Sequence, residues 1–555
     1  MVPGFAFKGT ESPPDYLSGA SLPSCGRAFD GQPATVAAAG PLVRESRRQA
    51  REREADRQRS ERYSAARHAL GIHGCVTVTC RYVFPRPFGD DGSLRAAVEA
   101  AVAQVISKLG ALRVGIAGHD QPRPAFVQVL SVDLRQHVEW NALDAGSPSY
   151  DSDLLGLIGS QHGLRFPDID QRPPWRLVVV PNRAAGWMDA VFALHHAVGD
   201  GTSVSLFHVH LLEAFNHPAE LGAALRGHVL TIPEPPLLVP AQEDVVNFRM
   251  SWPFFLRQAW KALAPPWLRL PWPAATPLWT ANPVTFTPIT THLRLVRMAP
   301  RTAEALLSAC RSNGATLTAL LNALVCAVLA RRLPTPSPRS FSAVLPISLR
   351  PFATAPAGSE LDIATMFCNL VTVMDLPFPP EVVADLCGSP PVFAVSSEDS
   401  DDSRIWHLAA RLRGQIKERL RMIPNDDVLD MLAWVPDFHA WIRQQEGQAR
   451  GSTWEMSNLG SIAGEDKKAG GRGWTIRGPI FAQPANVRGA AFTVNVFGIR
   501  GDAVSLTLTW QEGIIEAELG EGVATDLQRC LDDFAKTGTF CILGRRGDQP
   551  EAAGL

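Results

Sequence analysis

The sequence predicts an α/β protein made of two large domains or of two similar halves of one domain. Its 555 residues are 46% hydrophobic, which is enough material for two cores. Strand-like apolar stretches alternate with helical apolar patterns along most of the chain. Between about 226 and 290 the composition changes to proline and tryptophan, which indicates a connection between the halves. The expected divisions are a tail at 1–57, a first half at 58–225, the connection at 226–290 and a second half at 291–545.

Charge and cysteine usage restrict the function classes. The chain has 53 Lys and Arg against 55 Asp and Glu, a formal charge of −2, so no basic excess points to nucleic acid. Its nine cysteines are widely separated and have neither disulfide-framework nor metal-site spacing. The sequence has no apolar signal segment at its start and no apolar run long enough to span a membrane. We therefore expect a cytoplasmic protein without a metal or other bound cofactor, and we expect a monomer.

Residues 1–57 lack hydrophobic periodicity. They begin with a sequence rich in Pro, Gly and Ser and lead into the charge run Arg44–Arg62. This composition is typical of a disordered tail, with a solvated helix as the alternative for the charged end. An imperfect gene model would also produce so unpatterned a beginning.

The first half shows a regular order of strands and helices. Order is expected from Arg62, followed by a strand at 75–83. Apolar residues spaced three and four apart from Leu94 to Leu109 predict a helix that Ser93 caps and Gly110 ends. Further strands are expected at 112–116, 125–130, 175–180 and 188–194, the last two joined by a turn at 182–186.

The second half continues this alternation. Thr316 is expected to cap a helix over 317–333 that is apolar around nearly its whole circumference. An acidic loop is expected at 396–403 and a polar turn at 457–461. Strands are predicted at 291–296, 341–345, 370–374, 492–497 and 504–510, and further helices after Pro300, over 405–420 and over 523–534.

The stretch Phe192–Gly201 carries the residues that point to chemistry. His195 and His196 follow the apolar strand, and Asp200 lies at the predicted start of the next helix, where a carboxylate can accept backbone N–H bonds. Taken singly, these residues would be two core histidines and a helix cap. The complete spacing H-H-x-x-x-D-G between a strand and a helix favours an active site.

This motif resembles that of acyltransferases with the chloramphenicol-acetyltransferase and condensation-domain fold. The other segments that agree with it are Arg62–Gly71, Trp175–Leu177, Gly314–Leu321, Leu349–Phe352, Ser457–Gly460 and Leu508–Gly513. Together they resemble the alcohol O-acetyltransferase family of yeasts and filamentous fungi, over about residues 58–540. The D-F-G-W-G signature of the related plant acyltransferases is absent.

The resemblance implies an α/β fold of two chloramphenicol-acetyltransferase-like sandwich halves, a pseudo-dimer with an active-site tunnel at their interface. It implies that His196 is the general base, that His195 positions it, and that Asp200 is structural, with Gly201 completing the motif. Acyl-CoA, here acetyl-CoA, would enter as cosubstrate from one mouth and the alcohol from the other. Neutral imidazole titrates in the range that removal of a hydroxyl proton needs.

Two further roles follow from the resemblance. Arg350 is expected to form a salt bridge with Asp200, with Arg67 as the alternative partner. Ser457 or Asn458 is the candidate donor to the oxyanion, although Ser-Asn-Leu-Gly is equally consistent with a simple turn.

The expected activity is direct transfer of an acetyl group from acetyl-CoA to an alcohol or to a hydroxyl of a secondary metabolite. The alternatives are a longer acyl-CoA or an amine acceptor, and a non-catalytic condensation-like binding protein. A further alternative is that Cys368 accepts the acyl group first, although no serine or cysteine nucleophile adjoins the histidines. The Trp-rich segment 251–273 either packs across the seam or, being aromatic, basic and amphipathic, contacts a membrane or lipid-droplet surface.

Overall fold

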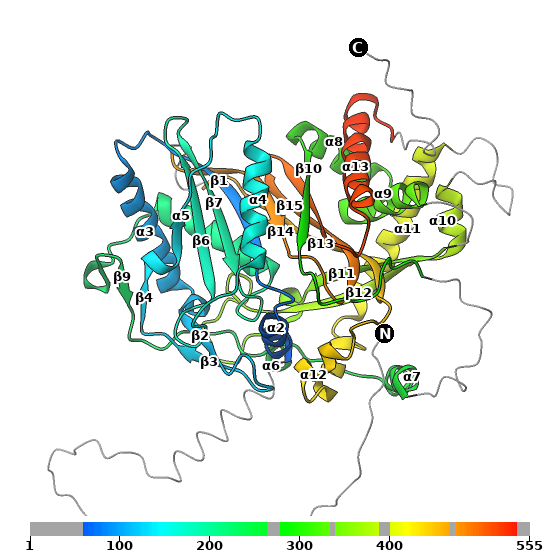
Figure 1. Ribbon diagram of the computed structural model, residues 1–555, viewed down its shortest axis with the longest axis horizontal. Coiled ribbons are helices and arrows are strands. Elements are labelled where there is room, and N and C mark those ends of the chain that lie inside the picture. Colours follow the sequence, from blue (N-terminus) through cyan, green and yellow to red (C-terminus); the bar gives the residue numbers. More distant parts are fainter. Residues whose placement is uncertain are drawn as a thin grey trace, which may run out of the picture.

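Two mixed β-sheets lie side by side in the computed structural model, with helices packed beyond each of them (Figure 1). The structure describes residues 59–263, 278–333, 339–387, 400–466, 470 and 472–540. The expected tail at 1–57 lies outside the described residues, as do Trp267, Trp272 and positions 396–399 of the expected acidic loop.

The first sheet contains the hairpin that precedes the histidines. β6 (Trp175–Asn182) and β7 (Trp187–Leu194) pair in antiparallel register, which confirms the predicted strands and turn. Along β6, Leu177 and Val179 pack into one core and Val178 into another, as the period-two alternation of a strand requires. The strand order is β14 (Thr475–Ala482), β1 (Val76–Val83), β7, β6 and β5 (Val138–Trp140), with α3 (Asp91–Lys108) and α5 (Gly201–Asn216) on one face and α4 (Tyr150–Gly163) on the other.

The second sheet and its helices form the other half. Helix α9 (Leu317–Arg332) is buried along most of its length, and the Thr316 hydroxyl accepts the backbone N–H of Ala319 at 3.3 Å, which confirms the predicted cap. The strand order is β10 (Thr291–Met298), β16 (Val504–Gln511), β15 (Ala490–Arg500), β13 (Ser452–Ala463), β11 (Phe341–Ser348) and β12 (Val371–Phe378). The other covering helices are α8 (Pro300–Ser312), α10 (Pro380–Leu386), α11 (Asp401–Met422) and α13 (Ala517–Thr537).

One strand and one helix join the two halves. β14 lies late in the sequence, yet it pairs with β1, so that Ala482 is opposite Thr77. Leu154 and Ile158 of α4 pack in a cluster with strands of the first sheet, and Leu293 of β10 packs against the same cluster. The seam between the sheets is therefore built by residues from both halves, and β14 crosses the division expected near residue 291.

Three local predictions are wrong. Asp90, not Ser93, caps α3, because its carboxylate accepts the Ser93 N–H at 2.7 Å. The stretch 457–461 lies within β13 rather than in a turn, because it pairs with β15. Ser400 caps α11, so positions 401–403 begin a helix instead of a loop.

The connection between the halves leaves large aromatic side chains exposed. On α7 (Trp252–Leu263), Trp252 and Trp260 are 76% and 55% exposed, so the prediction that they pack across the seam is wrong. Trp279 does pack against Phe341 of β11, with ring centroids 6.3 Å apart. Among the described residues, no single helix is long and apolar enough to cross a membrane; α8 and α9 meet that criterion only together, bent by 97°.

The remaining elements are short, apart from α2, which Figure 1 places below the junction of the two sheets. They are α2 (Arg59–Ala69), β2 (Val114–Ala117), β3 (Ala125–Gln128), β4 (Ser131–Asp133), β8 (Leu225–Arg226), β9 (Val229–Thr231), α6 (Gln242–Val245) and α12 (Phe438–Arg443). The strand expected at 112–116 begins only at Val114, because a 3₁₀ turn precedes it.

Candidate active site

The H-H-x-x-x-D-G motif spans the turn from β7 to α5. β7 ends immediately before His195 and His196, and Asp200 is the residue before α5 begins. The Oδ1 atom of Asp200 accepts the Ser203 N–H at 2.9 Å, which is the helix cap expected from the sequence. The motif is therefore fixed at both ends by regular structure.

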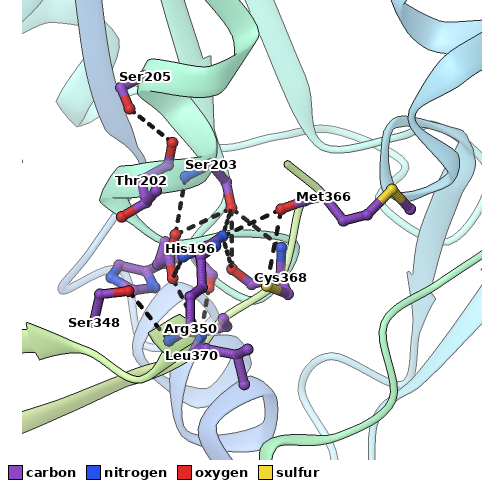
Figure 2. A network of polar contacts seen from close by, with 11 residues as sticks. His196, Thr202, Ser203, Ser205, Ser348, Arg350, Met366, Cys368 and Leu370 are labelled. Carbon is purple, nitrogen blue, oxygen red and sulfur yellow. Dashed lines mark hydrogen bonds and ion pairs between the residues drawn. The ribbon is translucent and has the colours of Figure 1, made fainter. Parts of the chain in front are cut away.

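Asp200 forms a buried ion pair with Arg350, the partner expected from the sequence. Arg350 Nη1 lies 2.5 Å from Asp200 Oδ2, and the two side chains are only 6% and 1% exposed. Arg350 Nη2 lies 2.9 Å from Ser203 Oγ and 3.3 Å from the carbonyl oxygens of Met366 and Cys368 (Figure 2). Burial disfavours the guanidinium charge, but the neighbouring Asp200 outweighs burial and raises the pKa of Arg350.

The backbone around Cys368 closes the same network. The N–H of Leu370 donates to Asp200 Oδ2 at 3.2 Å, and the N–H of Asp200 donates to the Cys368 carbonyl at 3.1 Å. Asn369 Nδ2 donates to the carbonyl of His196 at 3.0 Å, so this segment also holds the second histidine. The sequence did not indicate this role, because backbone donors and acceptors leave no side-chain pattern.

Cys368 itself has the surroundings of a structural thiol. Burial, followed by the charge of Asp200, raises the pKa of Cys368 to about 12. The reactive form of cysteine is the thiolate, and a group with this pKa remains a thiol at neutral pH. This setting does not favour the alternative in which Cys368 accepts the acyl group.

His196 has a neutral ring with one nitrogen turned inward. Its Nδ1 is buried and has no hydrogen-bond partner in another described residue, while its own backbone carbonyl interacts with the ring. Burial, followed by the positive charge of Arg67, lowers the pKa of His196 to about 4; the carbonyl and Asp200 act in the opposite direction. At neutral pH the ring is therefore uncharged and Nε2 can accept a proton.

His195 is buried in the protein interior. Its Nδ1 accepts the Ala197 N–H at 2.9 Å, and its ring centroid lies 4.5 Å from that of His68 on α2. Burial, with the neighbouring histidines, lowers the pKa of His195 well below its usual range. Its Nε2 is buried with no partner among the described residues, so the ring can hold the turn but is not presented to a substrate.

Strand β13 meets the motif from the second half. A Cβ atom on Gly201 would lie 2.5 Å from Leu459 Cδ2, so a larger residue there would require the Leu459 side chain to move. By period-two alternation Ser457 shares this face of β13, and its hydroxyl has no hydrogen bond to a described residue. Asn458 faces the other way: its Nδ2 donates to Thr318 Oγ1 at 2.9 Å, and its Oδ1 accepts a backbone N–H at 2.8 Å. Of the two predicted oxyanion donors, Asn458 therefore already has protein hydrogen-bond partners, whereas the Ser457 hydroxyl has none among the described residues.

A cavity of about 1080 Å³ opens at the seam between α4 and β10. Three arginines and one aspartate contribute to its wall, and His73 lies among its lining residues. The rings of His73 and His196 meet edge to face, with centroids 5.6 Å apart, so the cavity ends beside the second histidine of the motif. Small residues form its α4 side: Ser152, Gly156, Gly159, Ser160 and Gly163.

Comparison with known protein sequences identifies similar acyltransferases. Residues 148–352 match the family model described as alcohol acetyltransferase. The probable alcohol acetyltransferase FCK4 of Fusarium pseudograminearum is 29% identical over 493 residues, covering 87% of this chain and 96% of that protein. The probable alcohol acetyltransferase crmB of Aspergillus fumigatus is 24% identical over 484 residues, covering 82% and 94% respectively.

Solved structures share the fold. The trichothecene 15-O-acetyltransferase TRI3 of Fusarium sporotrichioides aligns with a TM-score of 0.61 at 11% identity, over 85% of this chain and 93% of that one. The first condensation domain of the calcium-dependent antibiotic synthetase aligns with a TM-score of 0.50 at 13% identity, over 85% and 93%. These likenesses confirm the predicted mixed α/β fold.

Proposed function

We propose that this chain, an acyltransferase similar to the alcohol acetyltransferases, transfers an acetyl group from acetyl-CoA to an alcohol. His196 Nε2 takes the hydroxyl proton while the alcohol oxygen attacks the thioester carbonyl. Collapse of the tetrahedral intermediate breaks the C–S bond, and the CoA thiolate takes the proton back from His196. The observation that carries this proposal is a neutral His196 held beside the seam cavity.

The other motif residues would position this base. The Asp200–Arg350 pair and the backbone of Cys368 fix the turn, and Asn369 fixes the carbonyl of His196. Ser457 would donate a further hydrogen bond to the thioester oxygen, as a secondary contribution to its stabilisation.

The seam cavity is our candidate site for the CoA portion of the donor. Its volume of about 1080 Å³ slightly exceeds the range of roughly 300–1,000 Å³ that is typical of small-molecule sites. β10 is an edge strand that pairs only with β16 in its sheet, so its outer side presents backbone N–H and C=O groups to an extended chain with amide groups. Two of the three wall arginines are ion-paired, Arg294 with Glu521 and Arg297 with Asp151, which leaves Arg165 as the candidate partner of a phosphate group.

Product analysis tests the proposed function. The purified full chain is incubated with acetyl-CoA and a panel of alcohols, and ester and free CoA are measured by mass spectrometry and thiol titration. We expect ester and CoA in equal amounts, and neither with His196→Ala above background. A wild-type protein that releases no CoA with any alcohol, or that acetylates amines in preference, would contradict the proposal.

We also propose that α7 makes a peripheral contact with an anionic lipid surface. Trp252, Leu256 and Trp260 are spaced four residues apart, so they lie on one side of the helix, and all three are exposed. The chain has no acidic residue between Asp244 and Glu304, so this surface carries no carboxylate of its own segment. Exposed tryptophan beside basic residues is the composition of interfacial helices.

Flotation with vesicles tests this contact. The wild type should float with vesicles that contain phosphatidylserine, and the double variant Trp252→Ser, Trp260→Ser should remain in the soluble fraction while retaining its melting temperature. Failure of the wild type to float at low salt would rule the contact out.

A further inference from the structure

Arg67 is a half-buried cation without a hydrogen-bond acceptor among the described residues. Its guanidinium carbon lies 4.6 Å from the ring centroid of Tyr63, whose hydroxyl is hydrogen-bonded to Arg488. Its Nε is buried, and it forms no hydrogen bond or ion pair with any described residue. A charge that is partly withdrawn from water is stabilised by an anionic partner, and the described residues supply none to Arg67. Pairing with Asp200 does not explain Arg67, since Arg350 occupies that place.

The guanidinium lies beside the proposed base. The charge of Arg67 is the largest charge effect on both His73 and His196, and it also acts on His195. His73 lines the seam cavity and contacts the His196 ring. α2 also contacts the motif directly, because the His68 ring lies 4.5 Å from the His195 ring, so Arg67 lies on a helix packed beside the proposed base.

The nearest carboxylate leaves the donors of Arg67 unused. Glu455 on β13 lies close enough to interact electrostatically with Arg67, but the two form no ion pair. Its Oε1 accepts Gln483 Nε2 at 3.3 Å, and its Oε2 accepts Asn486 Nδ2 at 2.8 Å. Both carboxylate oxygens are thus held by neutral amides, and the cation keeps its donors for another anion.

We propose that Arg67 is a catalytic residue that donates hydrogen bonds to the thioester carbonyl oxygen as this oxygen becomes negative. In the first step the alcohol oxygen bonds to the carbonyl carbon, its proton passes to His196 Nε2, and the carbonyl electron pair moves to the oxygen beside Arg67. In the second step that pair re-forms the carbonyl, the C–S bond breaks, and the thiolate takes the proton. This inference rests on the proposed acyl transfer.

The same charge links the strength of the base to the progress of the reaction. Before reaction the cation disfavours protonation of His196. The oxyanion formed beside Arg67 offsets that cation, so the pKa of His196 rises while the proton is being accepted. When the intermediate collapses, the oxyanion no longer offsets the positive charge of Arg67. The pKa of His196 therefore falls again, and its proton passes to the departing thiolate.

Substitutions on α2 test the inference, with Arg62 as a matched control. The Arg62 guanidinium donates to the carbonyls of Pro122 and Pro436 and so has a structural role on the same helix. Arg67→Met should lower kcat about 10²- to 10³-fold with little change in the KM for acetyl-CoA and no loss of melting temperature. Arg67→Lys should retain part of the rate. Arg62→Met should lower the melting temperature but leave kcat of the folded protein near wild type.

A pH profile and chemical rescue give readouts that a structural role would not move. Burial and the charge of Arg67 both lower the pKa of His196, so removing the charge in Arg67→Met should raise this pKa while burial continues to lower it. The acid limb of the kcat/KM profile should therefore move to higher pH by roughly one unit. Added guanidinium should restore part of the rate of Arg67→Ala but not of Arg62→Ala. The other titratable groups around Arg67 and His196 stay in place: Tyr63, His73, His195, Asp200, Glu455 and Arg488.

The outcomes separate this inference from the proposed function. Wild-type kcat in Arg67→Met would overturn the inference. So would a loss of rate that follows the melting temperature, with an unmoved acid limb and no rescue. A wild-type protein that makes no ester from any alcohol would instead contradict the proposed function itself.

Discussion

Two arginines beside the motif, Arg350 buried and Arg67 half-buried, are used in opposite ways. Arg350 has an acceptor for each terminal nitrogen, in Asp200, in Ser203 and in backbone carbonyls. Arg67 has an aromatic ring beneath it and no acceptor among the described residues. Arg350, with both terminal nitrogens paired, stabilises the turn that carries His196, whereas Arg67, with no acceptor for its guanidinium among the described residues, is available to a substrate. The comparison separates groups that hold the site from groups that act in it.

The two histidines show the same division and give the largest expected effect. His196→Ala should lower kcat about 10²- to 10⁴-fold with a nearly unchanged melting temperature, because a general base is lost. His195→Ala should keep measurable activity and lose stability instead, because its ring packs against His68 in the wall. Steady-state kinetics and thermal melts of both variants check this. Equal and mild effects of the two substitutions would break the comparison.

Breaking the satisfied pair should cost stability. Asp200→Asn should reduce the free energy of unfolding by about 3–5 kcal/mol, because it leaves the buried Arg350 charge unpaired. Arg67→Met should leave the free energy of unfolding nearly unchanged, because Arg67 has no ion pair to lose. Urea unfolding measures both, with Lys108→Gln as an exposed ion-pair control that should change little. An Asp200→Asn variant as stable as wild type would show that the pair does not hold the turn.

Filling the seam cavity should weaken binding of the donor. Gly156 lines the cavity and a Cβ atom on it would have no neighbour within 4 Å, so Gly156→Phe is the substitution chosen to fill this space. We expect the KM for acetyl-CoA to rise about tenfold, equivalent to about 1.4 kcal/mol, with a smaller change in kcat. Gly156→Ala is the control and should bind normally. An unchanged KM in Gly156→Phe would place the CoA elsewhere.

The smallest effects are expected on β13. Ser457→Ala should reduce kcat several-fold without destabilising the fold, because its hydroxyl bonds no described residue. Asn458→Ala should do the reverse and lower stability by about 1 kcal/mol per lost hydrogen bond. Rates and melting temperatures of the two variants test whether neighbouring residues on opposite faces divide in this way.

Features that depend on apolar spacing or on a short motif could be predicted from the sequence. The hairpin before the histidines follows from its apolar strands, and α9 follows from Thr316 and its apolar run. The positions of Asp200 and Arg350 follow from the motif and from a family resemblance. These signals are local in the sequence or belong to a recognisable motif, so they can be read from the sequence directly.

Features that depend on distant contacts could not be predicted. The apolar pattern of α4 is interrupted by Gly156, Gly159 and Gly163, although those glycines open the seam cavity. The pairing of β14 with β1 joins residues far apart in the sequence, and the hold on Asp200 comes from backbone groups. Arg67 forms no ion pair with Glu455, whose two carboxylate oxygens accept hydrogen bonds from the side-chain amides of Gln483 and Asn486. No sequence pattern indicates this arrangement.

The central claim is direct transfer from acetyl-CoA to the alcohol with His196 as the base. Initial rates measured while both substrates are varied test it most directly, because a ternary complex and an acyl-enzyme give different rate laws. The structure, with Cys368 held as a buried thiol, predicts intersecting lines in double-reciprocal plots. Parallel lines, together with an acetyl group on Cys368 after incubation with acetyl-CoA alone, would contradict the account.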